Sequence, residues 1–145
     1  MENKTQNQLY DRDFNLWIEQ MITTLRNRDT KAMDWNNLLE EIEDMGKSEK
    51  RSLESYLERL VEHILKLKYW EVEKARNYKH WQVEVVNFRN RIFRLLDRSP
   101  SLKKYMEEIY PKIFDDAVSA QQIEFTIPQN NFIELTQILE KDYFG

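Results

Sequence analysis

The sequence contains no cysteine, which excludes disulfides, thiolate zinc sites, iron–sulfur clusters and cysteine nucleophiles. It has only 2 glycines and 3 prolines, too few for glycine-rich phosphate loops or a serine nucleophile elbow. No stretch approaches the ~20 apolar residues of a membrane span, and residues 1–8 are polar, unlike a secretory signal. We therefore expect a cytoplasmic protein with no cofactor and no membrane partner, and we favour a role that is not enzymatic.

The composition is that of a folded chain rather than a disordered one. Hydrophobic residues make up 41% of the sequence and aromatic residues 12%, and 145 residues are enough to bury one sizeable core. We see no internal repeat, low-complexity tract or domain boundary. The domain prediction is therefore a flexible N-terminus over residues 1–9 and a single helical-bundle domain over residues 10–145.

Apolar residues recur every three or four positions in most of the chain, the spacing of one face of a helix. The stretches with this spacing are residues 13–28, 35–45, 49–70, 78–97, 102–117 and 132–143. We therefore predict an all-α fold, a compact bundle of about five main helices plus a short C-terminal helix. The stretch 49–70 has the broadest apolar arc, which predicts a place at the centre of the bundle.

A few residues mark where helices begin, end or bend. Asp13 and Asp34 suit helix starts, because their carboxylates cap free backbone N–H groups. Gly46 suits a helix end, but it is also compatible with a weak point inside a longer helix. Residues 35–70 therefore read as either one helix or two. Pro111 falls within the fifth stretch and predicts a kink there rather than a break.

The net charge of -4 is unevenly distributed. Residues 1–65 carry 9 basic and 14 acidic side chains, residues 66–104 carry 11 and 4, and residues 105–145 carry 2 and 8. The basic segment 66–104 is the one feature that suggests nucleic acid as a partner. Against this stand the low pI of about 5.3 and the position of Trp81 on an apolar stripe rather than on an open stacking platform.

Three ionisable side chains stand next to apolar stripes, where an unpaired charge is costly. They are Glu41, His63 and Arg89, and Lys66 lies one helical turn after His63. One interpretation is a structural network in which Arg89 bridges Glu41. The other is a ligand or metal pocket between helices, for which His63 and Glu41 are the weak candidate metal ligands, since their spacing matches no established signature.

An acidic cluster accompanies this constellation. It consists of Glu40, Glu43, Asp44 and Glu49. These carboxylates could add oxygen ligands to a metal site, but a solvated face beside a helix start is the usual explanation for such a run. Nothing in the cluster has the spacing of a calcium loop.

Several short blocks occur in a characteristic order. They are Tyr10-Asp11-x-Asp13-Phe14-x-Leu16-Trp17, Asp34-Trp35, the block from Glu40 to Glu49, the block from Glu62 to Lys66, Trp81 with Arg89, and Ser99-Pro100-Ser101-Leu102. Together they resemble the bacterial family called domain of unknown function 29, over the chain from about Tyr10 to the C-terminus. The resemblance implies an α-helical, cytoplasmic bacterial protein and carries no established activity.

Five residues of interest fall on motif positions of that family, which assigns no role to any of them. They are Glu41, His63, Lys66, Trp81 and Arg89. The polar connector from Phe125 to Asn131 has no clear match in the family pattern.

The leading functional hypothesis is a small helical interaction or adaptor protein, with self-association as one form of it, because long amphipathic helices without a catalytic signature suit partner binding. The first alternative is an enzyme or a ligand- or metal-binding protein with a Glu41, His63 and Arg89 pocket. The second alternative is nucleic-acid binding through residues 66–104.

Overall fold

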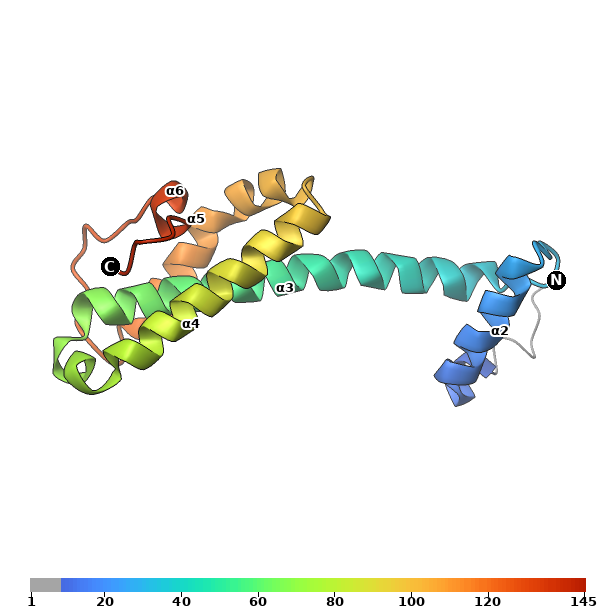
Figure 1. Cartoon of the computed structure of the whole chain (residues 1–145), viewed down its shortest axis with the longest axis horizontal. Coiled ribbons are helices and arrows are strands. Elements are labelled where there is room, and N and C mark those ends of the chain that lie inside the picture. The colour runs from blue at the N-terminus through green and yellow to red at the C-terminus, as the bar shows by residue number, and fades with distance from the viewer. Residues whose placement is uncertain (1–8) are drawn as a thin grey trace. The chain divides into compact units, whose positions relative to one another are not determined.

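The computed structural model describes residues 9–145, and that part of the chain contains helices and no strand (Figure 1). The helices are α2 (Phe14–Arg26), α3 (Trp35–Tyr69), α4 (Glu71–Arg98), α5 (Leu102–Gln121) and the short α6 (Leu135–Ile138). The prediction of an all-α fold is confirmed. None of the helices in residues 9–145 combines the length and apolar character needed to cross a membrane.

The chain divides into two compact units, one ending at Ser48 and the other beginning at Glu49. Each unit has a separate cluster of buried apolar side chains. The single domain over residues 10–145 stays a prediction. Of the segment predicted to be flexible, residues 1–8 lie outside the described part of the chain, whereas Leu9 is helical and buried.

The N-terminal unit is built on a small core. Its buried apolar residues are Leu9, Trp17, Met21 and Met33. Asp13 caps α2 as predicted, since its Oδ1 accepts a hydrogen bond of 3.0 Å from the backbone N–H of Leu16. The buried carboxylate of Asp34, directly before α3, accepts a 3.0 Å bond from Trp17 Nε1 and a 2.7 Å bond from Asn37 Nδ2. This carboxylate ties the start of α3 to α2.

The open question about residues 35–70 is settled, because α3 is one continuous helix from Trp35 to Tyr69. Gly46 lies inside it rather than at a helix end, and a Cβ built at Gly46 would meet no atom within 4 Å. The buried residues of α3 all come from its second half, between Leu53 and Leu67. The first half of α3 therefore has no share in the large core.

The C-terminal unit packs the second half of α3 with α4 and α5 (Figure 1). The predicted broad apolar arc of α3 is confirmed, since seven of its residues are buried there. α4 begins at Glu71, earlier than the predicted start at residue 78. α5 continues through Pro111 without a break, as predicted.

The predicted C-terminal helix over residues 132–143 is wrong in length, because only Leu135–Ile138 is helical. On either side the backbone is irregular and its carbonyls bind side chains of the bundle. The Tyr110 hydroxyl donates a 2.5 Å hydrogen bond to the carbonyl of Ile133. At the other end of the segment, the guanidinium of Arg89 donates hydrogen bonds to backbone carbonyls. These side-chain donors replace the N–H groups that would otherwise bond the carbonyls within a helix.

Candidate functional site

Arg89 holds the C-terminal segment rather than a carboxylate. Its guanidinium, 2% exposed on α4, donates to the carbonyls of Ile138 (Nε, 2.8 Å), Lys141 (Nη1, 3.3 Å) and Tyr143 (Nη2), and it lies 5.5 Å from the centre of the Phe144 ring. Burial lowers the pKa of Arg89 from its ordinary value. Arg89 is thus bound within the C-terminal unit, and its bridge to Glu41, a residue of the other unit, stays a prediction.

His63 is half-buried on α3, with its ring centre 5.7 Å from that of Phe88. Its Nδ1 lies 2.6 Å from the carbonyl oxygen of Arg59, one turn earlier, and so carries a proton and donates to it. Burial lowers the pKa of His63, and the nearby charge of Lys66 also lowers it. Within residues 9–145, no group of three or more His, Asp or Glu side chains is placed to hold a metal ion.

Glu41 belongs to the N-terminal unit and is half-exposed. It accepts a hydrogen bond from the hydroxyl of Tyr10, and this bond is the main cause of a raised Tyr10 pKa. The predicted meeting of Glu41 with His63 needs a turn between them, and the continuous helix α3 has none. The candidate constellation is divided between the two units, with Glu41 in the N-terminal unit and His63 and Arg89 in the C-terminal unit.

Trp81 is a core residue of the C-terminal unit. It is 6% exposed, and its ring stacks on that of Trp70 at 5.8 Å, while Trp70 stacks in turn on Phe125 at 5.0 Å. This aromatic stack ties the connector after α5 to α4. Trp81 is therefore not available as a stacking platform for a base, as its position on the apolar stripe predicted.

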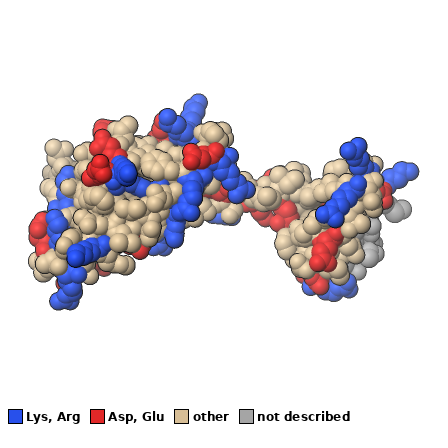
Figure 2. All heavy atoms as spheres, in the orientation of Figure 1, with Lys and Arg blue, Asp and Glu red and all other residues tan. Residues whose placement is uncertain are grey.

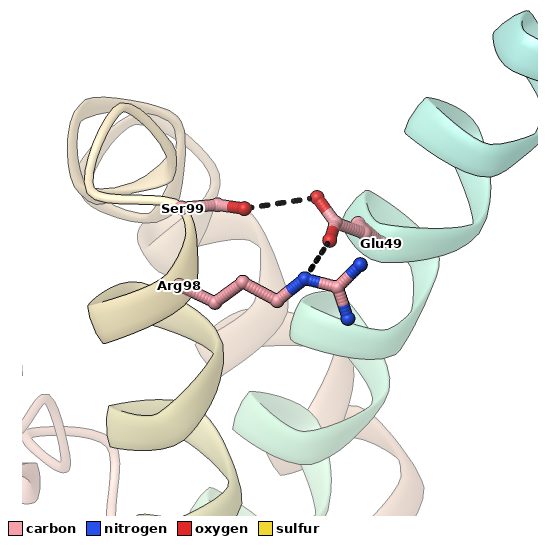
Figure 3. Close-up of polar contacts among 3 residues, drawn as sticks. All are labelled: Glu49, Arg98 and Ser99. Atoms are coloured by element: carbon pink, nitrogen blue, oxygen red, sulfur yellow. Dashed lines mark hydrogen bonds and ion pairs between the residues drawn. The ribbon is translucent and has the colours of Figure 1, made fainter.

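The acidic cluster spans the boundary between the two units. Glu40, Glu43 and Asp44 are exposed in the N-terminal unit. Glu49 lies in the C-terminal unit, where Figure 3 shows it between Arg98 Nε, at 3.5 Å, and the Ser99 hydroxyl, which donates a 3.1 Å hydrogen bond. Glu49 thus fastens the end of α4 to α3 and is not free to bind a cation.

The basic residues of segment 66–104 lie mostly on the exposed side of α4. Arg76, Lys79, His80, Arg91, Arg94 and Arg98 are all exposed. Figure 2 shows Lys and Arg side chains spread across the visible face of the C-terminal unit, with uncharged surface between them. Of these residues, Arg91 lies 5.4 Å from the Phe88 ring centre, and Arg98 pairs with Glu49.

A groove of about 440 Å³ runs beside α4 and the C-terminal segment. Its lining includes Val86, Phe93, Phe144 and Arg89. Neither Glu41 nor His63 lines it, so it is not the pocket that the sequence predicted. The guanidinium at its edge already donates to three backbone carbonyls.

Exposed apolar side chains are the feature of the N-terminal unit that sequence reasoning missed. On α3, Trp35, Leu39 and Ile42 are 56–58% exposed and Met45 is 62% exposed, although their spacing is that of a helix face packed on a core. The Trp35 indole N–H donates a 3.2 Å bond to the carbonyl of Thr30, which fixes the ring in this position. Residues 42–48 are exposed without exception.

α2 carries a second exposed stripe. Trp17 and Met21 fill the small core, whereas Phe14, Ile22 and Leu25 on the adjoining side of the helix are 42–52% exposed. The apolar arc of α2 is thus wider than the rest of the N-terminal unit covers. We call the combined set of exposed residues, Phe14, Ile22, Leu25, Trp35, Leu39, Ile42 and Met45, the apolar face.

The two stripes turn toward the same general side of the helix pair. Tyr10 contacts Glu41 and Trp17 contacts Asp34, so the chain from Tyr10 to Trp17 advances as α3 is followed backwards. At about 100° per residue, the exposed stripe of each helix is turned from its buried stripe in the same rotational sense. α2 lies across the start of α3 (Figure 1), and in such a pair equal senses of rotation turn both stripes toward one general side.

Comparisons with known proteins bear on the family alone. Neither the search of curated proteins nor the search of solved structures gave a match. The family model described as domain of unknown function DUF29 matches residues 9–144, which is nearly the whole chain. The chain therefore belongs to the DUF29 family.

Proposed function

We propose that this chain is a helical interaction protein whose apolar face, on the N-terminal unit, docks a helix of another polypeptide. The observation that supports this is the exposure of two apolar stripes on one side of the helix pair, where Trp35, Leu39 and Ile42 are each more than half exposed. The family resemblance implies that the protein acts in the bacterial cytoplasm.

Physical chemistry favours a partner for such a surface. Fully burying a large apolar side chain contributes about 1.5–3 kcal/mol, so half-exposed members of the apolar face retain much of that free energy for binding. Contiguous apolar patches on otherwise polar proteins are typical of interaction sites. Residues spaced 4, 3 and 3 along one helix, as Trp35, Leu39, Ile42 and Met45 are, match the way helices dock in grooves.

The residues of the predicted polar pocket support the same choice. Arg89 donates to backbone carbonyls, His63 Nδ1 donates to the backbone carbonyl of Arg59, and Glu41 accepts a hydrogen bond from the Tyr10 hydroxyl. Each of these groups has a structural partner in its own unit. The interaction role is therefore preferred over the ligand-binding alternative.

A charge placed on the apolar face tests the proposal. Ile42→Glu puts a carboxylate on a residue that is 58% exposed, so the fold should tolerate it while association is lost. Ile123→Glu is the matched control, because Ile123 is 87% exposed and lies in the C-terminal unit. Sedimentation over a concentration series measures self-association, and quantitative capture from bacterial extract measures other partners.

The expected result is that the wild-type chain and the Ile123→Glu variant associate alike and that Ile42→Glu weakens association at least tenfold. A wild-type chain that stays monomeric, and that captures the same proteins at the same yield as Ile42→Glu, would remove the docking function altogether.

A further inference from the structure

We infer that the occupant of the apolar face is a second copy of this chain, with the first half of α3 packed antiparallel against the same segment of its partner. This inference rests on the proposed docking function and names its partner. The argument depends on the pattern of residues along α3, which is complementary to itself when one copy is reversed.

The seam of this contact is narrow and regular. Trp35, Leu39, Ile42 and Gly46 are spaced 4, 3 and 4 residues apart, so they fall within a strip about 60° wide on α3. This spacing is that of a and d positions in a coiled coil, with Leu39 and Gly46 at a and Trp35 and Ile42 at d. In an antiparallel pair, a residues of one helix form layers with d residues of the other.

Reversing one copy pairs large side chains with small ones. If Leu39 is set opposite Ile42 of the copy, Trp35 falls opposite Gly46 of the copy, because both pairs share one midpoint along the helix. The indole then occupies the space that Gly46 leaves. That space is open within one chain, since a Cβ at Gly46 meets nothing within 4 Å. A glycine inside a helix otherwise costs about 1 kcal/mol relative to alanine.

The edges of the seam agree with the same register. Glu43 flanks one side and falls opposite Asn36 of the copy, so a carboxylate faces an amide and no two like charges oppose each other. On the other side of the seam, Met45 is exposed and extends the apolar contact, whereas Leu38 is half-buried on the core of its own unit. A twofold contact of this kind uses one patch twice, as most homodimers do. Phe14 and Leu25 of α2 widen the surface on the same side.

The contact predicts which residues can be cross-linked. The full chain has no cysteine, so single substitutions give unambiguous disulfides. We would mix Leu39→Cys with Ile42→Cys, each carrying a tag of a different length, and oxidise them at 50–100 µM, an estimate set by the usual strength of small helical interfaces. The expected product is the mixed dimer, in clear excess over either homodimer. Homodimers in excess would mean a parallel pairing and would overturn the inference.

A second variant tests the fit of Trp35 to Gly46. A Cβ at Gly46 meets no atom of its own chain, whereas the side chain of Gly46→Leu collides with the indole of the copy twice per dimer, so we expect the dimer Kd to rise about 100-fold. Lys47→Leu is the control, since it adds the same side chain about 100° round the helix, and it should leave the Kd within threefold. Circular dichroism confirms that both variants are helical.

The two proposals fail in different ways. A wild-type chain that is monomeric at 100 µM, while its capture of other proteins still depends on Ile42, would overturn the inference that the partner is a second copy. The proposed docking function would remain supported. A dimer whose Kd is unchanged by Gly46→Leu would also overturn the inferred register. A dimer lost with Gly46→Leu and kept with Lys47→Leu supports it.

Discussion

The two units of this chain have the same helical spacing of apolar residues, but they bury these residues to different extents. In the C-terminal unit, 21 buried residues form one core and partly buried aromatic rings pack around it. Among residues 9–48 of the N-terminal unit, four apolar residues form the buried core, whereas eight large apolar side chains are exposed. Helical spacing of apolar residues is present in both. Periodicity therefore predicts a helix face that is able to pack, and it leaves open whether the partner belongs to the same chain.

α3 makes this contrast within one element. Its second half buries seven residues between Leu53 and Leu67 in the large core. Its first half exposes Trp35, Leu39 and Ile42, and the neighbouring Leu38 is half-buried on the small core of the N-terminal unit. The C-terminal unit also exposes some large apolar side chains, such as Val72, Val83 and Ile123. The second half of α3 is nevertheless buried in its core, whereas the first half is the part that we propose a partner covers.

The largest effect on stability should come from removing the Arg89 guanidinium, which binds carbonyls of the C-terminal segment. Arg89→Ala leaves the buried carbonyl of Ile138 and the part-buried carbonyl of Tyr143 without their donor, and we expect the free energy of unfolding of this unit to fall by about 3–5 kcal/mol. Urea unfolding, monitored by amide hydrogen exchange, measures this loss of stability. Arg94→Ala, on the exposed side of the same helix, is the control and should change stability by no more than about 0.5 kcal/mol.

If Arg89→Ala melted both units equally, the description of each unit as having its own core would be contradicted. Protection lost from residues 49–145 while amides of α2 keep theirs is the outcome that the two separate clusters predict.

A smaller effect is expected from Asp34, whose carboxylate is buried in the N-terminal unit. Asp34→Ala removes the acceptor of the Trp17 indole N–H and of the Asn37 amide, which should cost about 1–3 kcal/mol. Because the unit has only a small core, this loss should release its amides to exchange while the C-terminal unit stays protected. Asp44 is exposed on α3, and the control substitution Asp44→Ala should leave the exchange of these amides unchanged.

Much of the fold followed from the sequence because local rules decided it. Asp13 caps α2 since a carboxylate before a helix satisfies free N–H groups, and the arc from Leu53 to Leu67 was wide enough to require burial on several sides. The C-terminal helix was overestimated because Arg89, nearly 50 residues away, takes the carbonyls that an extended helix would have used. A contact so distant in sequence has no local signal.

The residues of the candidate site lie in both units. Glu41 and His63 are on the same continuous helix, because a lone glycine costs a helix only about 1 kcal/mol and Gly46 did not end this one. The exposed stripe from Trp35 to Met45 could not be distinguished from a buried one, since both have the same spacing. Gly46 within that stripe was the available signal, as a residue that leaves space on an otherwise bulky face.

The smallest effect, and the sharpest test of the contrast within α3, concerns Gly46 itself. Gly46→Ala should stabilise the N-terminal half of α3 by about 1 kcal/mol when the chain is dilute enough to be monomeric, because the new methyl group meets no atom and the helix loses less backbone entropy. Thermal unfolding by circular dichroism, with hydrogen exchange of residues 42–48, measures the gain. Ser48→Ala, two positions on, changes helix propensity less and should give a smaller gain. If Gly46→Ala instead destabilised the monomer, the space at Gly46 would have to be filled by this chain. The exposed stripe would then not be open to a second copy.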